Sequence, residues 1–552
     1  MKIVGLWAGH DTSFCVLDQG VPVIHAELER YNREKSPSGD AIEFALSRSK
    51  NLVEEATHFT SVYPVNKITQ HSMSFENAKS IAKSNGGDFH FISHHKAHAA
   101  HSFYSSKIKK ALVVTLDGGG VEDGNGAETA LTVWLGDDID LKHVKTFNPK
   151  EVNIGGVWTR VTRYVFKLQN GWPLGSQEGT VMAMAALGDP RKYHDDFYLM
   201  LTSDLLQAGF KPPGQPKGAY VPGKDPVHPY LDKWSKIADR SDQDKFDLAA
   251  SFQSATERYV KELLTVILDA YPNYKDLCLS GGVVLNSVCM GKIKKWFVDR
   301  INDVYIPPVP YDGGLCLGSA QYLWHSVLRN PRIEWKDNFT AYLGEEWNRD
   351  DVDNAIKAMP KNLRVSHSND EKVVNLLTQG KIISIFNGKS ESGRRALGNR
   401  SIIADPRHED MKDKVNLKVK HRQWFRPFAP SILAEDVDKW FKNPCSSPYM
   451  QFVLDFKDDV KDKVPAVVHF DGTARLQTVT KNDNPWYYNL ISMFKDKTGV
   501  PIILNTSFND REPICETPAH AIDCFSSTNI DYLYFPEYNL IIEKINDGEN
   551  LK

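Results

Sequence analysis

The sequence predicts an α/β fold whose first part carries a duplicated architecture. Short β-branched runs alternate with turns from the first residues onward. A strand, a turn carrying Gly and Asp, and a further strand occur at 2–17 and again at 111–135. A second series of strand, turn and helix begins at residue 381. No close internal sequence repeat accompanies these patterns, so the duplication is one of architecture.

The predicted strands of the first part are apolar or β-branched runs that end at turn residues. They are 2–6, 13–17, 21–26, 111–116 and 129–135. Asp18-Gln19-Gly20 predicts a hairpin turn between the second and third of these strands. A helical pattern follows at 41–48.

The middle of the chain predicts an insertion, a long helix and a domain boundary. The stretch 205–245 is rich in Pro, Gly, Lys and Asp, which is typical of an irregular surface insertion. Helical periodicity runs over 246–271 and leads into a strand with a glycine turn at 277–282. A boundary near 330–345 divides the chain into domains at 1–340 and 341–552.

The composition is that of a globular protein with almost no net charge. The chain has 552 residues, with 67 Lys and Arg against 70 Asp and Glu, and 41% are hydrophobic. This balance argues against a generally cationic nucleic-acid binder, though not against a local basic site. No run approaches the roughly 18 apolar residues of a membrane span. Seven scattered cysteines without a CxxC pair predict a reduced, cytoplasmic location.

Two histidines and an aspartate predict a metal site. His94 and His98 stand four residues apart in HHKAH, which on a helix places both imidazoles on one face. Asp312, on a proline-rich turn before two glycines, is the candidate third ligand. Such a set suits Fe(II), Mn or Zn and leaves positions open for substrate. Because this spacing alone is weak evidence for a metal site, the alternative is a pair of helix-surface or core histidines.

Three glycine turns, each after a strand-like run, favour a nucleotide-type cleft. They are 117–120, 280–282 and 312–314. Glycines allow backbone N–H groups to approach a phosphate. Each turn alone is more often a plain tight turn, and the chain has neither a P-loop nor a spaced GxGxxG.

The strongest signal is a basic stretch in the second part. Residues 381–426 hold twelve Lys and Arg against five Asp and Glu, a net of +7 in a chain of net −3. Arginines stand beside glycines and aromatics in SGRRALG and FRPF, an arrangement typical of a polyanion pocket because guanidinium groups bind phosphate bidentately. Arg475 and the polar segment LNTSFN could complete this pocket. The alternative is a solvated basic face.

These motifs in this order resemble the O-carbamoyltransferase family, which includes nodulation-factor, tobramycin and cephalosporin carbamoyltransferases. The resemblance covers nearly the whole chain, through GLWAGHDTSFCVL, HHKAHA, LDGGG, EGTVMAMAALG, LSGGVVLNSV, PPVPYDGGLCLGSA, ESGRRALGNRS, FRPFAPS, DGTARLQTV and LNTSFNDREPI. It implies a duplicated actin-like (ASKHA, Kae-like) domain at 1–340 and a YrdC-like α/β domain at 341–552.

The resemblance implies an ATP-dependent enzyme with two half-reactions. The YrdC-like domain would form carbamoyladenylate from carbamoyl phosphate and ATP with Mg²⁺, releasing pyrophosphate and phosphate. The Kae-like domain would transfer the carbamoyl group to a hydroxyl with the help of a metal, usually iron. The acceptor stays open between a natural-product alcohol and a hydroxymethylated nucleobase in a nucleotide or in DNA. A homodimer is the default expectation for a soluble oligomer.

The resemblance also assigns roles to single residues. His94, His98 and Asp312 match the metal ligands, and Asp117 matches the acid beside the metal and is expected to act in catalysis. The residues that match the nucleotide-facing turn and the activation site are Gly281, Gly282, Asn286, Arg395, Lys420, Arg426, Arg475, Asn505 and Ser507. Among these, Arg395, Lys420 and Arg426 are also expected to act in catalysis. Arg394 stands where the family commonly has Pro, so Arg395 is expected to be the functional arginine.

Two further acidic or basic groups have open roles. His10 is the candidate general base for the acceptor hydroxyl, because a histidine pKa near the working pH suits proton transfer. Alternatively, His10 only hydrogen-bonds Asp11 or the backbone. Glu178 either contacts nucleotide or acceptor, or only stabilises the start of a helix.

Two other functions remain open on the sequence. A threonylcarbamoyl-type tRNA modification enzyme would use both domain types with bicarbonate and threonine, although RRALGNRS and RPFAPS argue against it. A non-enzymatic actin-like nucleotide-binding module would leave the spaced histidines and the basic stretch unexplained. Labelled threonine and a metal analysis would separate these alternatives from a carbamoyltransferase.

Overall fold

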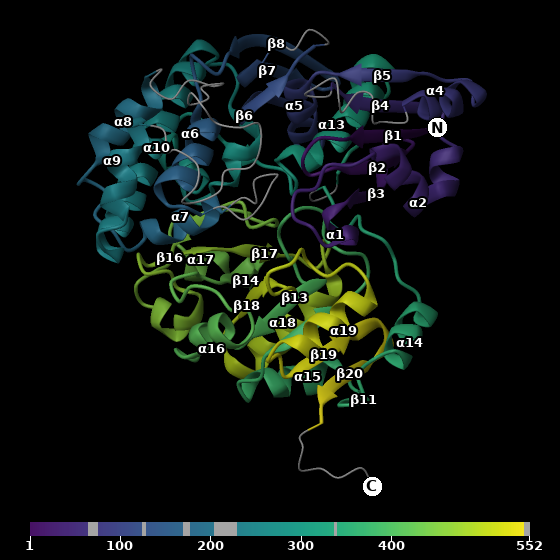
Figure 1. Ribbon diagram of the computed structural model, residues 1–552, viewed down its shortest axis with the longest axis vertical. Coiled ribbons are helices and arrows are strands. Elements are labelled where there is room, and N and C mark those ends of the chain that lie inside the picture. The colour runs from purple at the N-terminus through teal and green to yellow at the C-terminus, as the bar shows by residue number, and fades with distance from the viewer. Residues whose placement is uncertain (64–74, 124–127, 169–176, 204–228, 336–338, 546–552) are drawn as a thin grey trace. The chain divides into compact units, whose positions relative to one another are not determined.

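The protein is described here from a computed structural model, which covers residues 1–63, 75–123, 128–168, 177–203, 229–335 and 339–545 (Figure 1). The chain divides into two compact units. The first comprises Met1–Glu29 and Lys35–Phe339, and the second comprises Arg30–Glu34 and Thr340–Lys552. Arg30–Glu34 therefore join the second unit, although the division by sequence places them in the first domain.

The first unit contains two five-stranded sheets with the same topology. One has the order β3-β2-β1-β4-β5 and the other β8-β7-β6-β9-β10. In each, three strands form an antiparallel meander, a fourth strand pairs in parallel with the first of them, and a fifth pairs in parallel with the fourth. The strands are β1 (Lys2–Trp7), β2 (Ser13–Asp18), β3 (Val21–Glu27), β4 (His58–Val62), β5 (Phe89–Ile92), β6 (Lys110–Val121), β7 (Glu128–Asp137), β8 (Asp140–Phe147), β9 (Asp276–Ser280) and β10 (Asp303–Tyr305).

The repeated sheet confirms the predicted α/β fold with a duplicated first part. All five strands expected in the first part are present and differ from the expected bounds by one or two residues, except at the end of β6. There the strand continues to Val121 through Asp117 and the glycines that were expected to end it, with a register shift between Leu116 and Gly120. The expected turn is thus a bulge inside a strand, which changes the direction of the side chains that follow.

Two helices pack closely on the first sheets. They are α5 (His94–Tyr104) and α13 (Leu315–Tyr322), which contact one another. At their crossing, a Cβ on Gly318 would lie 1.9 Å from the carbonyl oxygen of Ala97. Only glycine therefore permits this approach, which sets the position of both helices.

The other α-helices of the first unit include a long amphipathic one. They are α2 (Ala41–Glu54), α4 (Phe75–Ser84), α6 (Ile154–Arg160), α7 (Glu178–Ala185), α8 (His194–Thr202), α9 (Pro229–Ala238), α10 (Asp242–Ala270), α11 (Ser287–Met290) and α12 (Ile293–Trp296). Helix α1 (Glu29–Asn32) begins with the last residue of the first unit before Arg30, and its other residues belong to the second unit. Helix α10 packs against α7, α8 and α9, and its first turn is capped by Ser241, whose hydroxyl accepts the N–H of Asp244.

The predicted irregular insertion at 205–245 is wrong for its second half. Residues 204–228 lie outside the described part of the chain, but 229–238 form helix α9. Leu231, Trp234 and Ile237 recur at helical spacing and are buried. This short apolar face was hidden by the Pro- and Gly-rich composition of the preceding stretch.

The second unit is an α/β domain built on a mixed sheet of eight strands. Their order is β11-β20-β19-β12-β13-β18-β14-β17, and β15 pairs with β16 in a separate ribbon. The strands are β11 (Leu363–His367), β12 (Ile383–Phe386), β13 (Arg400–Ala404), β14 (Ala429–Leu433), β15 (Val453–Asp455), β16 (Thr473–Arg475), β17 (Gln477–Val479), β18 (Ile502–Ser507), β19 (Tyr532–Phe535) and β20 (Leu540–Lys544). Its α-helices are α14 (Arg349–Lys357), α15 (Asp370–Thr378), α16 (Met411–Lys418), α17 (Val437–Trp440), α18 (Pro485–Thr498) and α19 (Pro518–Ser527).

The predicted order of strand, turn and helix after residue 381 is wrong. Strand β12 is followed by an irregular segment and then by the antiparallel strand β13. Gly388, Gly393 and Gly398 in this segment all have positive φ, a conformation that a helix does not admit. Three backbone reversals within eleven residues therefore replace the expected helix.

Candidate functional site

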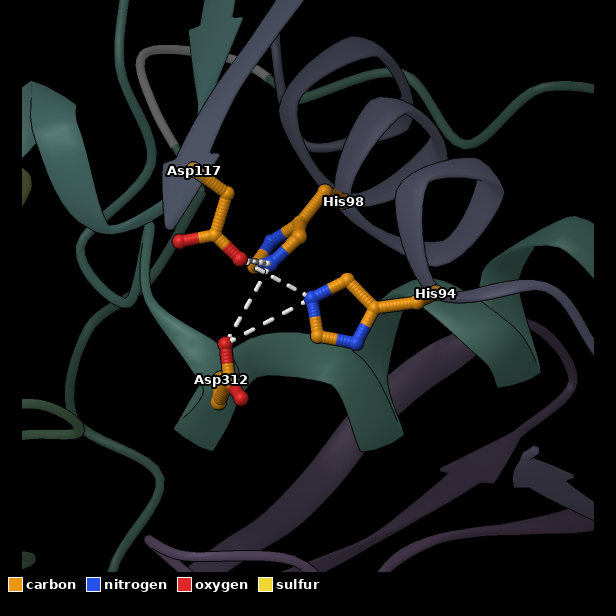
Figure 2. A group of neighbouring side chains, drawn as sticks. All are labelled: His94, His98, Asp117 and Asp312. Carbon is orange, nitrogen blue, oxygen red and sulfur yellow. Dashed lines mark hydrogen bonds and ion pairs between the residues drawn. The ribbon is translucent and has the colours of Figure 1, made fainter. Parts of the chain in front are cut away.

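Four buried side chains of the first unit converge on one point (Figure 2). His94 and His98 lie one turn apart on α5, as the spacing predicts. Asp117 comes from the bulged strand β6, and Asp312 begins the short turn that precedes α13. One ligand atom from each of the four lies within 4.8 Å of the other three.

The distances between these side chains suit ligands that surround one cation. His94 Nε2 lies 3.0 Å from Asp117 Oδ2. His98 Nε2 lies 3.6 Å from Asp117 Oδ2 and 3.5 Å from Asp312 Oδ1. This nitrogen is buried and makes no hydrogen bond within the described residues. Two imidazoles and two carboxylates, with one imidazole nitrogen that lacks a hydrogen-bond partner, match the donor set of a divalent transition metal.

A neighbouring glycine turn holds the Asp117 carboxylate in place. The N–H of Gly282 donates to Asp117 Oδ1 at 3.0 Å. Gly281 has φ 99°, and a Cβ there would lie 2.2 Å from the carbonyl oxygen of Leu116. Gly281 and Gly282, which the sequence assigns to nucleotide binding, thus bring strand β9 against the metal-ligand candidate.

Electrostatics at the cluster favour a bound cation. Burial alone would raise the pKa of Asp117, but the adjacent imidazoles of His94 and His98 lower it well below its usual range. Burial lowers the pKa of His98, yet the two carboxylates outweigh this effect and raise it to about 9. The Asp117 carboxylate therefore favours positive charge beside it.

The middle histidine of the HHKAH motif has a different role. Burial and the nearby His94 lower the pKa of His95 to about 3, so this imidazole is neutral. Its Nδ1 lies 2.6 Å from the hydroxyl of Thr115 and its Nε2 donates to the carbonyl of Thr129 at 2.8 Å. His95 thus ties α5 to strands β6 and β7 and keeps the other two imidazoles in register.

His10 lies at the rim of the cluster, in the loop between β1 and β2. Its Nδ1 is 3.0 Å from Asp11 Oδ2, and its Nε2 is 3.4 Å from Asp312 Oδ2. The imidazole is 55% exposed, in contrast to the buried ligand candidates. Partial desolvation of the ring lowers its pKa, but the charges of Asp312 and Asp11 raise it to about 9. The expected contact with Asp11 and the approach to the metal-ligand candidates therefore occur together.

Two other predicted residues of the first unit are placed by local contacts. Asn286 accepts the N–H of Cys289 at 3.1 Å as a helix cap and exchanges two hydrogen bonds with Gln253. Its amide is thus largely used within the fold. Glu178 is the first residue of α7, the position at which a carboxylate stabilises a helix.

The second unit contains a cluster of four arginines. Arg395, Arg426 and Arg475 were predicted, and Arg422 joins them. Burial, followed by the charges of the other three, lowers the pKa of Arg475 well below its usual range. Burial lowers the pKa of Arg426 to about 10. Guanidinium groups held together at this electrostatic disadvantage are typical of an anion site.

Two details show how the cluster is held. Arg475 Nε is buried and makes no hydrogen bond within the part of the chain that is described. Arg422 donates to Asn416 Oδ1 at 2.8 Å and to the carbonyl of Pro427 at 3.2 Å, and its guanidinium lies 4.7 Å from the centre of the Phe428 ring. The sequence pointed to Arg422 only as one of the twelve basic residues of the stretch.

Lys420 and Ser507, which the resemblance assigns to the activation site, lie together, but the ammonium group is engaged by the protein. Lys420 Nζ donates to the carbonyls of Ser507 and Asn509 at 2.9 and 2.6 Å, and to Asn509 Oδ1 at 2.5 Å. The side chain is buried. The buried Lys420 side chain therefore holds the backbone at the end of β18 and just after it.

Asn505 lies beneath the segment that carries Arg395. Its Nδ2 donates to the carbonyl of Ala396 at 3.1 Å, to Ser431 Oγ at 3.0 Å and to Gln477 Oε1 at 3.0 Å. Its Oδ1 is buried and has no hydrogen-bond partner among the described residues. Asn505 thus connects three strands of the sheet to the residue next to Arg395.

Comparisons with known proteins cover both units. Residues 42–321 match the family model "Carbamoyltransferase N-terminus", and residues 374–543 match "Carbamoyltransferase C-terminus". Nodulation protein NolO of Bradyrhizobium diazoefficiens is 33% identical over 459 residues, which are 80% of this chain and 77% of the relative. Nodulation protein NolNO of Sinorhizobium fredii is 33% identical over 462 residues, 81% of this chain and 63% of the relative.

Among solved structures, HypF of T. kodakarensis matches at a TM-score of 0.34 and 16% identity, covering 59% of this chain and 47% of that chain. Overlap this limited carries no argument about the present chain. The two family models and the two nodulation proteins confirm the resemblance drawn from the motifs. The chain therefore belongs to the carbamoyltransferase family and is a transferase enzyme.

Proposed function

We propose that this protein is an ATP-dependent O-carbamoyltransferase that carries out two half-reactions at two sites. In the second unit, carbamoyl phosphate and Mg²⁺-ATP would give carbamoyladenylate. In the first unit, the carbamoyl group would pass to an acceptor hydroxyl. The observation that carries this proposal is the presence of two sites of different chemistry: a cluster of four arginines and a convergent set of two imidazoles and two carboxylates.

The arginine cluster suits the first half-reaction. Water takes up the phosphoryl group of carbamoyl phosphate, and an oxygen of the resulting carbamate bonds to the α-phosphorus of ATP while pyrophosphate leaves. Both substrates and both leaving groups are polyanions. Preorganised guanidinium groups aimed at developing phosphate charge are the main catalytic resource for such a transfer. Arg395, Arg426 and Arg475 would bind these anions, while Lys420 and Asn505 support the segments around them.

The first unit suits the second half-reaction. His94, His98, Asp117 and Asp312 would hold a divalent transition metal, with Fe(II) favoured by the family resemblance and Mn or Zn also compatible. When bound, it would act as a Lewis acid on the carbamoyl oxygen. The acceptor oxygen bonds to the carbamoyl carbon, and AMP leaves with the electrons of the broken C–O bond.

His10 is proposed to take the proton of the acceptor hydroxyl. Its Nε2 lies 3.4 Å from Asp312, and the imidazole is exposed enough for an acceptor to reach it. The charges of Asp312 and Asp11 keep its pKa near 9 in the protein alone. As the Asp312 charge is offset by coordination, that pKa falls toward the range in which a general base works.

The proposal is tested by following the two half-reactions separately. Wild-type protein with ATP, Mg²⁺ and carbamoyl phosphate should release pyrophosphate, and it should carbamoylate an alcohol in a panel that includes hydroxymethylated nucleotides and DNA. Arg426→Ala should lose pyrophosphate release and keep its bound metal. His98→Ala should keep pyrophosphate release and lose the carbamoylated product.

Two results would contradict the proposal. One is pyrophosphate release that does not depend on carbamoyl phosphate. The other is incorporation of labelled threonine with bicarbonate, which would favour a threonylcarbamoyl enzyme.

A further inference from the structure

An arginine from the first 30 residues of the chain is buried in the second unit. Arg30–Glu34 belong to that unit, and Arg30 is 2% exposed. Burying a guanidinium carries a large desolvation cost unless it is paired and hydrogen-bonded. The groups that Arg30 contacts therefore indicate which part of the second unit its burial stabilises.

Arg30 binds the segment that carries Arg395. Its Nη2 donates to the carbonyl of Glu391 at 3.0 Å and to the carbonyl of Gly393 at 2.7 Å. Its Nη1 lies 3.7 Å from Glu516 Oε2, a carboxylate that is itself 2% exposed. Both bonded carbonyls lie within four residues of Arg395 on its N-terminal side.

The C-terminal side of the same segment is held by the carboxylate of Glu391. This side chain accepts the backbone N–H groups of Leu397 and Asn399 at 2.7 Å each and that of Arg400 at 3.2 Å. The segment is thus held by hydrogen bonds on both sides of Arg395, from Arg30 before it and to the Glu391 carboxylate after it. Because Gly393 and Gly398 have φ 90° and 123°, the segment has little conformational restraint of its own.

The buried charges around this segment balance one another, so the loss of one leaves another uncompensated. The side chains of Arg30, Arg400, Glu391 and Glu516 are all buried, which gives two positive and two negative groups. Ser390 Oγ also donates to the Glu516 carboxylate at 2.8 and 2.9 Å. Removal of the Arg30 guanidinium leaves one buried carboxylate charge uncompensated and two carbonyls without their donor.

We propose that Arg30 is a positioning residue for the anion site: it fixes residues 391–400 so that Arg395 stays within the arginine cluster. This inference rests on the proposed function, because the cluster is taken to bind carbamoyl phosphate and ATP. Arg30 is proposed to act through the backbone that presents Arg395.

The test compares Arg30→Lys and Arg30→Ala with Arg364→Met. Arg364 is a matched control in the same unit, 53% exposed and paired with Glu543 on neighbouring strands. We expect Arg30→Ala to raise the KM for carbamoyl phosphate by about 10-fold or more, which corresponds to about 1.4 kcal/mol. The kcat should fall by a smaller factor. Arg30→Lys should be intermediate, because one ammonium cannot reproduce the fork that reaches two carbonyls and a carboxylate.

Two further measurements separate positioning from a general loss of folding. Millimolar methylguanidinium should restore part of the KM of Arg30→Ala and leave Arg364→Met unchanged. In the ligand-free protein, the amides of Leu397, Asn399 and Arg400 should exchange hydrogen faster in both Arg30 variants, while the helical core of the second unit stays protected. If Arg30→Ala does not fold, Arg30→Lys carries both measurements.

Folded Arg30 variants with wild-type KM and wild-type exchange at these amides would overturn the inference. A wild-type protein that releases no pyrophosphate from ATP and carbamoyl phosphate would refute the proposed function instead. In that case the exchange measurement still decides whether Arg30 holds the segment.

Discussion

Replacing Arg426 by methionine should stabilise the ligand-free protein while removing its response to anions. Burial lowers the pKa of Arg426 from 12.5 to about 10. That difference corresponds to roughly 3 kcal/mol, at about 1.4 kcal/mol for each tenfold change in acidity. The guanidinium is charged in both the folded and the unfolded chain at neutral pH, so the folded protein bears this cost at any pH below about 10.

Methionine keeps an unbranched apolar stem and removes the charge. The loss of guanidinium contacts offsets part of the gain, since a typical hydrogen bond contributes roughly 0.5–1.5 kcal/mol. The expected net effect is a stabilisation of about 1–2 kcal/mol, or roughly 2–8 °C in Tm for a unit of this size. The gain is expected because the cluster binds anions at the expense of stability.

Thermal unfolding with and without inorganic pyrophosphate measures both effects. At about 100 times its Kd, pyrophosphate should stabilise the wild type by roughly 2.7 kcal/mol, and Arg426→Met should lose most of this shift. Arg364→Met is the control, since an exposed pair contributes about 1 kcal/mol or less and Arg364 is not among the arginines that act on Arg475. The reasoning would be refuted by a variant that is more than about 1 kcal/mol less stable without anions. It would equally be refuted by a pyrophosphate shift that equals that of the wild type.

Three further predictions concern the first unit. Asp312→Asn should lower the affinity for a reconstituting divalent metal by at least roughly 10-fold, measured as bound metal per chain, and an unchanged stoichiometry at limiting metal would contradict the site. Gly281→Ala should destabilise the protein by more than roughly 1–3 kcal/mol, because its Cβ would lie 2.2 Å from the Leu116 carbonyl at φ 99°. Gly472→Ala, at φ 81° with no atom within 4 Å, is the control and should cost much less in the same melt. Burial raises the pKa of Asp247, but the N–H of Asp189, Lys192 and Gln243 outweigh this and lower it, so its stabilisation is present above about pH 4 and is lost as the pH falls further. Asp247→Asn should therefore cost roughly 1–3 kcal/mol at pH 7 and show a smaller loss of stability on acidification, and an unchanged slope of urea midpoint against pH would contradict this.

The local sequence pattern was sufficient to predict elements whose form depends on neighbouring residues. The β-branched runs became strands, and the spacing of His94 and His98 predicted one face of a helix because α-helical geometry brings residues four apart together. The prediction failed at 229–238, where a short apolar face follows a Pro- and Gly-rich stretch. It also failed after residue 386, where glycines with positive φ replace a helix.

The sequence by itself determined the chemistry that is available: histidines at ligand spacing, a carboxylate on a rigid turn, and a net charge of +7 over residues 381–426. Only the tertiary structure decided how these groups are used. It placed the N–H of Gly282 on Asp117, engaged Lys420 within the fold, and brought Arg30 to Glu391 across 361 residues. Contacts of this kind have no local signature, because they depend on which buried charges must be compensated once the sheets have packed.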